Sequence, residues 1–95
     1  MAAYVIAEID IVDANAFDEY REKVPATIEA FGGRYVARGG ATESLEGAWS
    51  PRRLVVLEFP TMAQAKAWWD SPEYRPLRAL RERASRCRII LTEGV

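Results

Sequence analysis

Glu58 is the side chain of this sequence best placed to do chemistry. It is the one ionisable residue in the run Leu54–Phe59, which is otherwise apolar and typical of a β-strand. A carboxylate that is buried without a partner costs several kcal/mol, so we expect Glu58 to have either a partner or a task. In a partly dry cleft its pKa would be raised, and it would act as a general base or bind a donor group of a ligand. The alternative is an ion pair with an arginine that fixes the strand register or a dimer contact.

Three more charged residues are expected near Glu58 on the predicted sheet. Glu8 lies in the first strand and would raise the pKa of Glu58 further if the two carboxylates were close. Arg34 and Arg38 follow the Gly32–Gly33 turn. Strand alternation is expected to place both arginines on one face, where they would clamp the carboxylate or phosphate of a ligand. The alternative is that both arginines pair with Glu8 or Glu58.

Aromatic residues predict the walls of a ligand pocket. Trp68 and Trp69 are adjacent on a predicted helix and point roughly 100° apart, so only one of them fits the core. We expect Trp69 to line a pocket between helix and sheet with Tyr20 and Tyr74, which add stacking area and hydroxyl groups. Plain packing in the core is the alternative. Trp49 lies in a long loop and would either cover that pocket or contact a partner subunit.

The residues that are absent exclude several classes of site. The chain has no histidine, which excludes His-ligated haem, the common His-containing zinc sites, Ser-His-Asp triads and histidine bases. Cys87 is the single cysteine, so no intrachain disulfide is possible, and we expect it to be a small buried hydrophobe. No Gly-rich phosphate loop with its lysine is present. We therefore expect neither a metal nor another cofactor.

Charge and hydropathy indicate which partners to expect. The formal net charge is -1, so no global field favours nucleic acid or an anionic membrane. The arginine-rich segment 75–88 is interrupted by Glu82 and lacks an aromatic RNA-binding motif, so no nucleic-acid partner is expected. No apolar run is long enough to cross a membrane. Met1 leads straight into a strand without a signal peptide, and we expect a cytoplasmic protein.

The order of predicted elements indicates an α+β, ferredoxin-like fold in one domain of residues 1–95. Period-two and helical apolar patterns alternate as β-α-β-β-α-β, with the second helical crossover doubled. The helix boundaries come from caps: Asp13 or Asn15, the T-x-x-Q box at Thr61, and Ser71 before Pro72. Pro25 is expected to kink the first helix. The predicted strands are 3–12, 34–40, 53–59 and 87–93, the predicted helices are 13–31, 61–70 and 71–84, and 41–52 is a long loop.

One face of the predicted sheet has no helix to cover it. Its residues are too apolar to be left in water and too charged for an ordinary core. Two copies packed sheet against sheet would satisfy both properties, so we expect a homodimer in which apolar side chains seal the interface and carboxylates pair with arginines. The residues assigned to this face are Tyr4, Ile6, Glu8, Asp10, Arg34, Val36, Arg38, Leu54, Val56, Glu58, Arg88 and Ile90.

An ordered set of short motifs resembles domain-of-unknown-function family 1330, of the dimeric α+β barrel superfamily. The resemblance covers nearly the whole chain. It implies a homodimer whose sheets form a barrel, and it implies no particular reaction. The superfamily includes cofactor-free monooxygenases and haem-binding or haem-degrading enzymes, several of which depend on a histidine that this chain lacks. The motifs are Gly32-Gly33-Arg34-Tyr35, Gly39-Gly40, Leu45-Glu46-Gly47, Glu58-Phe59-Pro60 and Trp69-Asp70-Ser71-Pro72-Glu73-Tyr74.

Two functions are consistent with these features. The first is a small-organic-molecule site between the sheet and the second helical segment, with Tyr20, Trp69 and Tyr74 as walls and Arg38 and Glu58 as polar contacts. If this site is catalytic, we expect cofactor-free proton transfer or oxygenation with Glu58 as the base. The second is a non-catalytic dimerisation module without a ligand, in which the charged residues serve only register and assembly.

Overall fold

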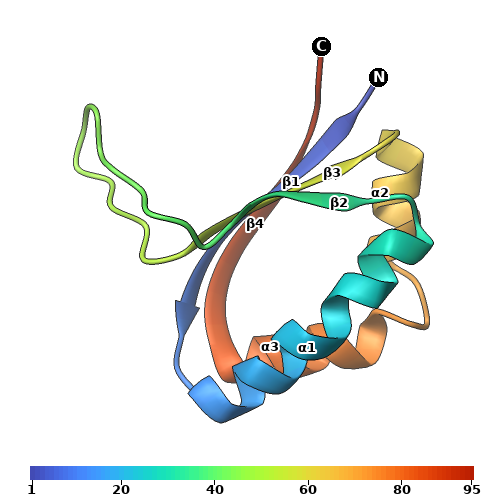
Figure 1. The fold of residues 1–95 in the computed structure, drawn as a ribbon, viewed down its shortest axis with the longest axis horizontal. Helices are drawn as coiled ribbons and strands as arrows, with labels where there is room; N and C mark the ends of the chain where they lie inside the picture. Colours follow the sequence, from blue (N-terminus) through green and yellow to red (C-terminus); the bar gives the residue numbers. More distant parts are fainter.

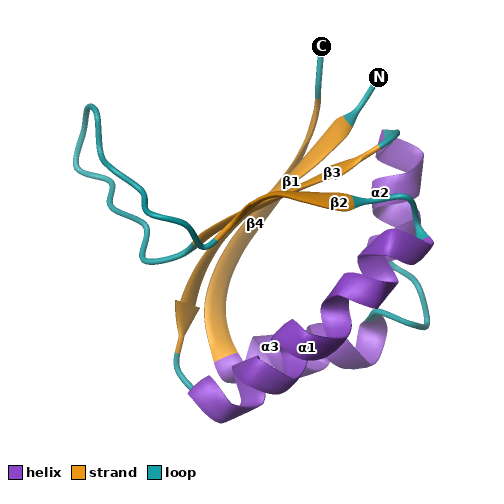
Figure 2. Ribbon diagram, in the orientation of Figure 1, coloured by secondary structure: helices purple, strands orange, loops and turns teal.

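The computed structural model describes all 95 residues and shows three helices against one face of a four-stranded sheet (Figures 1 and 2). The sheet order is β2-β3-β1-β4, and every neighbouring pair is antiparallel. This is the ferredoxin-like arrangement predicted from the sequence. The elements are β1 (Ala3–Ile11), α1 (Ala14–Ala30), β2 (Arg34–Arg38), β3 (Leu54–Phe59), α2 (Met62–Trp69), α3 (Arg75–Ala84) and β4 (Ser85–Glu93).

β1 lies in the middle of the sheet and separates the two faces by strict alternation. Ala3, Val5, Ala7 and Ile9 are buried under the helices, whereas the residues between them point to the open face. We call the side of the sheet that carries α1, α2 and α3 the covered face. The opposite side is the open face.

α1 has the predicted caps at both ends. The Asp13 carboxylate accepts the backbone N–H of Ala16 at 3.1 Å, and Gly32 follows the helix with a φ of 78°, which glycine adopts without strain. The helix continues past Pro25 to Ala30. Because proline has no N–H, the carbonyl of Arg21, one turn earlier, lacks its helical partner. That carbonyl instead accepts a hydrogen bond from the Arg38 Nη2 at 2.9 Å.

The second crossover differs from the prediction at its helix start. Thr61 caps α2 as expected, because its hydroxyl accepts the Gln64 N–H at 3.1 Å. Ser71 caps only a turn: its hydroxyl accepts the Tyr74 N–H at 3.1 Å, and α3 begins at Arg75 rather than directly after Ser71. Pro76 has no backbone N–H and is tolerated only in the first turn of a helix, and a helix that began at Pro72 would place it beyond that turn, which explains the later start. None of the three helices has the length and hydropathy of a transmembrane helix.

The core is built from aromatic rings between α1, α2 and the sheet. The largest fully buried side chains are Trp68, Tyr74, Phe59 and Ile28. The ring centroids of Trp68 and Tyr74 lie 4.1 Å apart, and those of Trp68 and Phe59 lie 5.3 Å apart. Trp68 is therefore the core member of the tryptophan pair, of which helix geometry had predicted that only one would fit the core.

β2 contains an irregularity that the sequence pattern did not predict. The pairing with β3 shifts between Tyr35 and Ala37, so Val36 is an extra residue in the strand. As a result, Arg34 pairs opposite Glu58 on the open face, whereas Arg38 pairs opposite Val55 on the covered face. The prediction that Arg34 and Arg38 share a face was wrong. The loop after β2 extends away from the body of the molecule on the open side (Figure 1).

Candidate functional site

Glu58 lies on the open face, held by two partners. Its carboxylate accepts hydrogen bonds from the Arg34 Nε at 2.6 Å and from the Tyr4 hydroxyl at 2.9 Å. The bond from Arg34, and then the bond from Tyr4, lower the pKa of Glu58 below its ordinary value. A general base in a dry cleft would have a raised pKa. The ion-pair alternative therefore describes this environment better than the base does.

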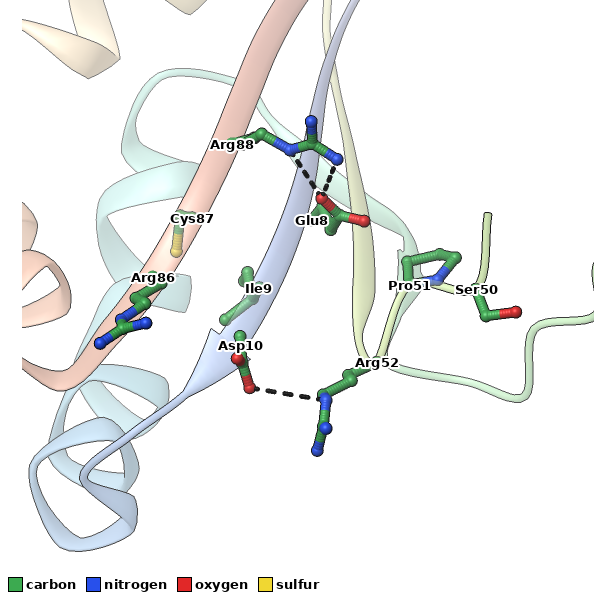
Figure 3. Close-up of a pocket in the computed structure, with 9 residues that line it drawn as sticks. All are labelled: Glu8, Ile9, Asp10, Ser50, Pro51, Arg52, Arg86, Cys87 and Arg88. Atoms are coloured by element: carbon green, nitrogen blue, oxygen red, sulfur yellow. Dashed lines mark hydrogen bonds and ion pairs between the residues drawn. The ribbon is translucent and has the colours of Figure 1, made fainter. Parts of the chain in front are cut away.

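Glu8 forms a second charged cluster further along β1. The Arg88 guanidinium donates to its carboxylate through Nε at 2.8 Å and Nη2 at 2.7 Å, and the Trp49 indole N–H donates at 2.7 Å (Figure 3 shows Glu8 and Arg88). These bonds, that of Trp49 first, lower the pKa of Glu8. Trp49 thus lies on the open face and does not cover a pocket under the helices. Asp10 faces Arg52 at 3.9 Å in a pocket of about 370 Å³ that Glu8 and Arg88 also line (Figure 3).

An aliphatic stripe crosses the open face between these two clusters. Ile6 lies opposite Val56 on one side and Ile90 on the other, in the register of the three strands. The side chain of Ile90 is 61% exposed and Val36 is 52% exposed. The open face therefore has an apolar centre flanked by charge pairs, as the sequence predicted, with Arg38 as the one residue misplaced.

Tyr20 and Tyr74 form a buried pair on the covered face. Their hydroxyls lie 2.9 Å apart, and the Arg81 Nε is 3.4 Å from the Tyr74 hydroxyl. Burial, followed by the neighbouring Tyr74, raises the pKa of Tyr20 far above its ordinary value, so Tyr20 remains a neutral phenol. Both residues are less than one-tenth exposed, and neither lines the cleft beside Trp69.

Trp69 lines an apolar cleft between α2 and β4, which we call the Trp69 cleft. Its volume is about 170 Å³. Lys66 is its only titratable lining residue. An apolar cavity of about 150 Å³ is known to admit benzene, so this cleft has room for one small ring. The lining residues are Val5, Ala65, Lys66, Trp69, Ile89, Ile90 and Leu91.

The structure thus divides the predicted ligand site between the two faces. Trp69, Tyr20, Tyr74 and Arg38 lie on the covered side, whereas the other predicted site residues, Glu58, Arg34 and Glu8, lie on the open side. Backbone of β1 and β3 separates Glu58 from the Trp69 cleft. No group of acidic and cysteine side chains gathers as metal ligands would.

Sequence reasoning missed one buried and one partly buried arginine. Arg81 is only 5% exposed, and Arg53 has a buried Nε without a hydrogen-bond partner. A signal for Arg81 existed, since it completes the helical spacing of Tyr74, Leu77 and Ala84 at three, four and three residues. No comparable signal marks Arg53, because its partial burial depends on contacts with Gly39 and Phe17, which are distant in sequence.

Comparison with known proteins places the chain in a family. The family model described as a domain of unknown function (DUF1330) matches residues 2–95. The chain belongs to this family. No curated protein matches the sequence. The family assignment therefore agrees with the resemblance noted from the motifs and names no reaction.

Solved structures share the DUF1330 fold seen here. RPA0582, a protein of unknown function from Rhodopseudomonas palustris, superposes with a TM-score of 0.79 at 18% identity, over 99% of this chain and 82% of that chain. SnoaB, a cofactor-independent oxygenase from Streptomyces nogalater, gives 0.69 at 10% identity, over 99% and 93%. A dimeric ferredoxin-like protein of unknown function from Jannaschia sp. CCS1 gives 0.67 at 14% identity, over 99% and 100%. At these identities the likeness establishes the fold alone.

Proposed function

We propose that the protein is a homodimer that binds a small, apolar organic molecule in the Trp69 cleft of each subunit. The cleft itself carries this proposal. It combines an aromatic wall from Trp69 with aliphatic side chains of β4, and the cationic Lys66 is its one charged group. A ring would stack on the indole, and a polar substituent would face Lys66.

The open face supports the homodimer. Its aliphatic stripe is exposed, and the carboxylates of Glu8 and Glu58 are already paired within the chain, so a second copy would bury apolar area without leaving these two carboxylates unpaired. The loop from Gly39 to Arg53 projects from the same side and carries the exposed Leu45 and Trp49, which would extend the contact. The Jannaschia protein of the same fold is dimeric.

Cofactor-independent oxygenation is the second candidate, favoured by the fold likeness to SnoaB. Oxygenation without a cofactor requires a substrate that forms a carbanion, and therefore a base or an acidic substrate. Glu58 cannot supply that base to the Trp69 cleft from the opposite face. Lys66 is the titratable group that lines the cleft, and in this mechanism it would stabilise or generate the substrate anion.

The non-catalytic dimerisation module remains the competing proposal. The pairs Arg34–Glu58 and Arg88–Glu8 would then serve only strand register and assembly. This proposal predicts that the Trp69 cleft stays empty in the purified protein and admits no small ring.

The test uses the three indole N–H groups as separate reporters. Those of Trp68 and Trp49 donate hydrogen bonds to Thr27 and Glu8, so NMR resolves their surroundings from that of Trp69. On titration with toluene or indole we expect saturable shifts of the Trp69 indole and of the Ala65 and Leu91 amides. A Trp69→Leu variant should lose the response, and the exposed control Trp49→Phe should keep it. The absence of saturable shifts in the cleft would overturn the proposal.

Native mass spectrometry of freshly purified protein tests assembly and ligand together. We expect twice the chain mass of 10.7 kDa, with an additional small mass on each subunit. A dimer without additional mass would favour the non-catalytic module. A monomer would refute the homodimer.

A further inference from the structure

Three arginines converge on a cavity between α1 and the β2–β3 edge of the sheet, away from the Trp69 cleft. The cavity has a volume of about 30 Å³. Its charged lining residues are Arg21, Arg38 and Arg53, and no carboxylate lines it. The rest of its wall is aromatic or aliphatic and consists of Ile9, Phe17, Tyr20, Val24, Tyr35 and Val55. We refer to it as the arginine cavity.

Arg38 reaches this cavity because of two features of the backbone. The extra residue Val36 turns Arg38 to the covered face. Pro25 leaves the Arg21 carbonyl without its helical partner, and the Arg38 Nη2 donates to that carbonyl at 2.9 Å. The Arg38 guanidinium also stacks 4.4 Å from the Tyr35 ring centroid. One edge of the guanidinium is therefore fixed.

Arg53 is the most unusual of the three. Its Nε is buried and has no hydrogen-bond partner, which native proteins rarely tolerate. Its guanidinium packs against Gly39, where a Cβ would lie 2.3 Å from Nη1, so this glycine makes room for it. Burial, followed by the charges of Arg21 and Arg38, lowers the pKa of Arg53. Asp18 bonds Arg21, and neither Arg38 nor Arg53 has a carboxylate partner.

From this geometry we infer that the arginine cavity binds an oxyanion, the carboxylate or phosphate group of a small organic molecule. Guanidinium groups match the planar fork of such an anion and remain charged at physiological pH. The cavity has room for about one water-sized group, so a single oxygen of the anion would point into it and the rest of the molecule would lie at its mouth, in solvent. The anion would neutralise the like charges of Arg38 and Arg53, neither of which has a carboxylate partner. This inference does not depend on the ligand proposed for the Trp69 cleft.

The test titrates the intact protein with sodium benzoate and with sodium phosphate at constant ionic strength, against sodium chloride. We expect a saturable shift of the Arg53 Nε–Hε signal in NMR and a saturable rise of the melting temperature. The anion with the lower dissociation constant identifies whether the cavity prefers a carboxylate or a phosphate. The exposed Arg38→Gln variant should weaken binding at least tenfold, and Arg53→Met, which replaces the guanidinium by an uncharged, unbranched side chain, should abolish it.

Arg83→Gln is the matched control, since Arg83 is exposed on α3 and outside the cavity. It should bind as the unmodified protein does. The inference would be overturned if neither anion gave a saturable shift at Arg53, or if Arg38→Gln and Arg83→Gln weakened binding equally. If Arg53→Met failed to fold, Arg38→Gln and the Arg53 signal of the unmodified protein would still decide the question.

Discussion

The two faces of the sheet differ in how far their apolar side chains are shielded from water. On the covered face, alternate residues of β1 are buried to 6% exposure or less against aromatic rings. On the open face, the residues between them form an aliphatic stripe that stays in solvent, bordered by the ion pairs of Glu8 and Glu58. The same strand therefore contributes to a complete core on one side and, on the other, to an exposed stripe that is the proposed dimer contact.

This difference indicates where sequence changes will be felt. Changes on the covered face should act on the folding of the single chain, because its contacts are complete within the chain. Changes on the open face should act mainly on association, because its apolar contacts would be completed by a second copy. The following predictions separate the two behaviours, from the largest expected effect to the smallest.

Trp68→Ala should have the largest effect on the covered face. Trp68 is 2% exposed, packs against Phe59 and Tyr74, and donates its indole N–H to Thr27 at 3.1 Å. Removal of a buried tryptophan lowers the free energy of unfolding by about 3–5 kcal/mol, measured by urea denaturation. The control Leu45→Ala, at a side chain 96% exposed, should change it by less than about 0.5 kcal/mol. Similar losses in the two variants would contradict the described core.

Ile90→Asp should break the open-face association without unfolding the chain. A carboxylate placed in an apolar interface should weaken the dimer at least about 100-fold, because the charge loses water and gains no partner. Light scattering after size exclusion should report the monomer, with an unchanged circular dichroism spectrum. Ala79→Asp adds the same charge at an exposed position of α3 and should stay dimeric. A dimeric Ile90→Asp protein would place the interface elsewhere.

Tyr20→Phe should cost an intermediate amount on the covered face. It removes one buried hydroxyl, and with it the 2.9 Å bond to Tyr74, which corresponds to about 1 kcal/mol of unfolding free energy. A double-mutant cycle with Tyr74→Phe should give a coupling of similar size. Tyr4→Phe, the equivalent change on the open face, should cost less because water replaces its lost bond. A cost for Tyr4→Phe equal to that for Tyr20→Phe would remove the proposed contrast between the faces.

The smallest expected effect is a pH dependence from the open face. The folded-state pKa values of Glu8 and Glu58 lie below the ordinary value of 4.5, so the unfolded chain binds more protons as the pH falls below this value. Their contribution to stability is complete at neutral pH and is lost as the pH drops through the folded-state pKa values. Urea denaturation across the acid range should show this loss, with a shallower slope in Glu8→Gln/Glu58→Gln.

A second variant serves as the control for the acid titration. Glu43→Gln/Glu46→Gln removes two carboxylates from the exposed loop, where neither forms an ion pair. It should keep the slope of the unmodified protein. If both double variants reduced the slope of unfolding free energy against pH equally, the pH dependence would come from the total number of carboxylates and not from the open-face pairs.

The fold was largely predictable because its signals are local and repeated. Alternation in β1, the T-x-x-Q cap and the glycines after α1 each act within a few residues, and the structure confirms them. The separation of Trp68 from Trp69 followed from helix geometry. The helix start predicted at Ser71 was wrong because the side-chain cap that Ser71 forms stabilises a turn equally well.

The candidate sites were less predictable because they depend on long-range placement. Glu58 could be recognised as unusual, yet its ion pair with Arg34 needed the β2–β3 register. Arg38 was assigned to the wrong face because no residue type in β2 indicates that Val36 is an extra residue in the strand. Arg53 gave no signal, since its burial depends on contacts with Gly39 and Phe17, which are distant in sequence.

The extra residue in β2 has a consequence for how relatives of this chain should be aligned. Arg34 and Arg38 are four residues apart in the chain, but Val36 occupies no place in the strand alternation. The two side chains are therefore an odd number of alternation steps apart and point to opposite faces of the sheet. A homologue with a deletion at this point would have a regular strand and still present both arginines to the same two faces. An alignment gap therefore belongs at Val36, and a gap placed elsewhere would pair residues from opposite sides of the sheet.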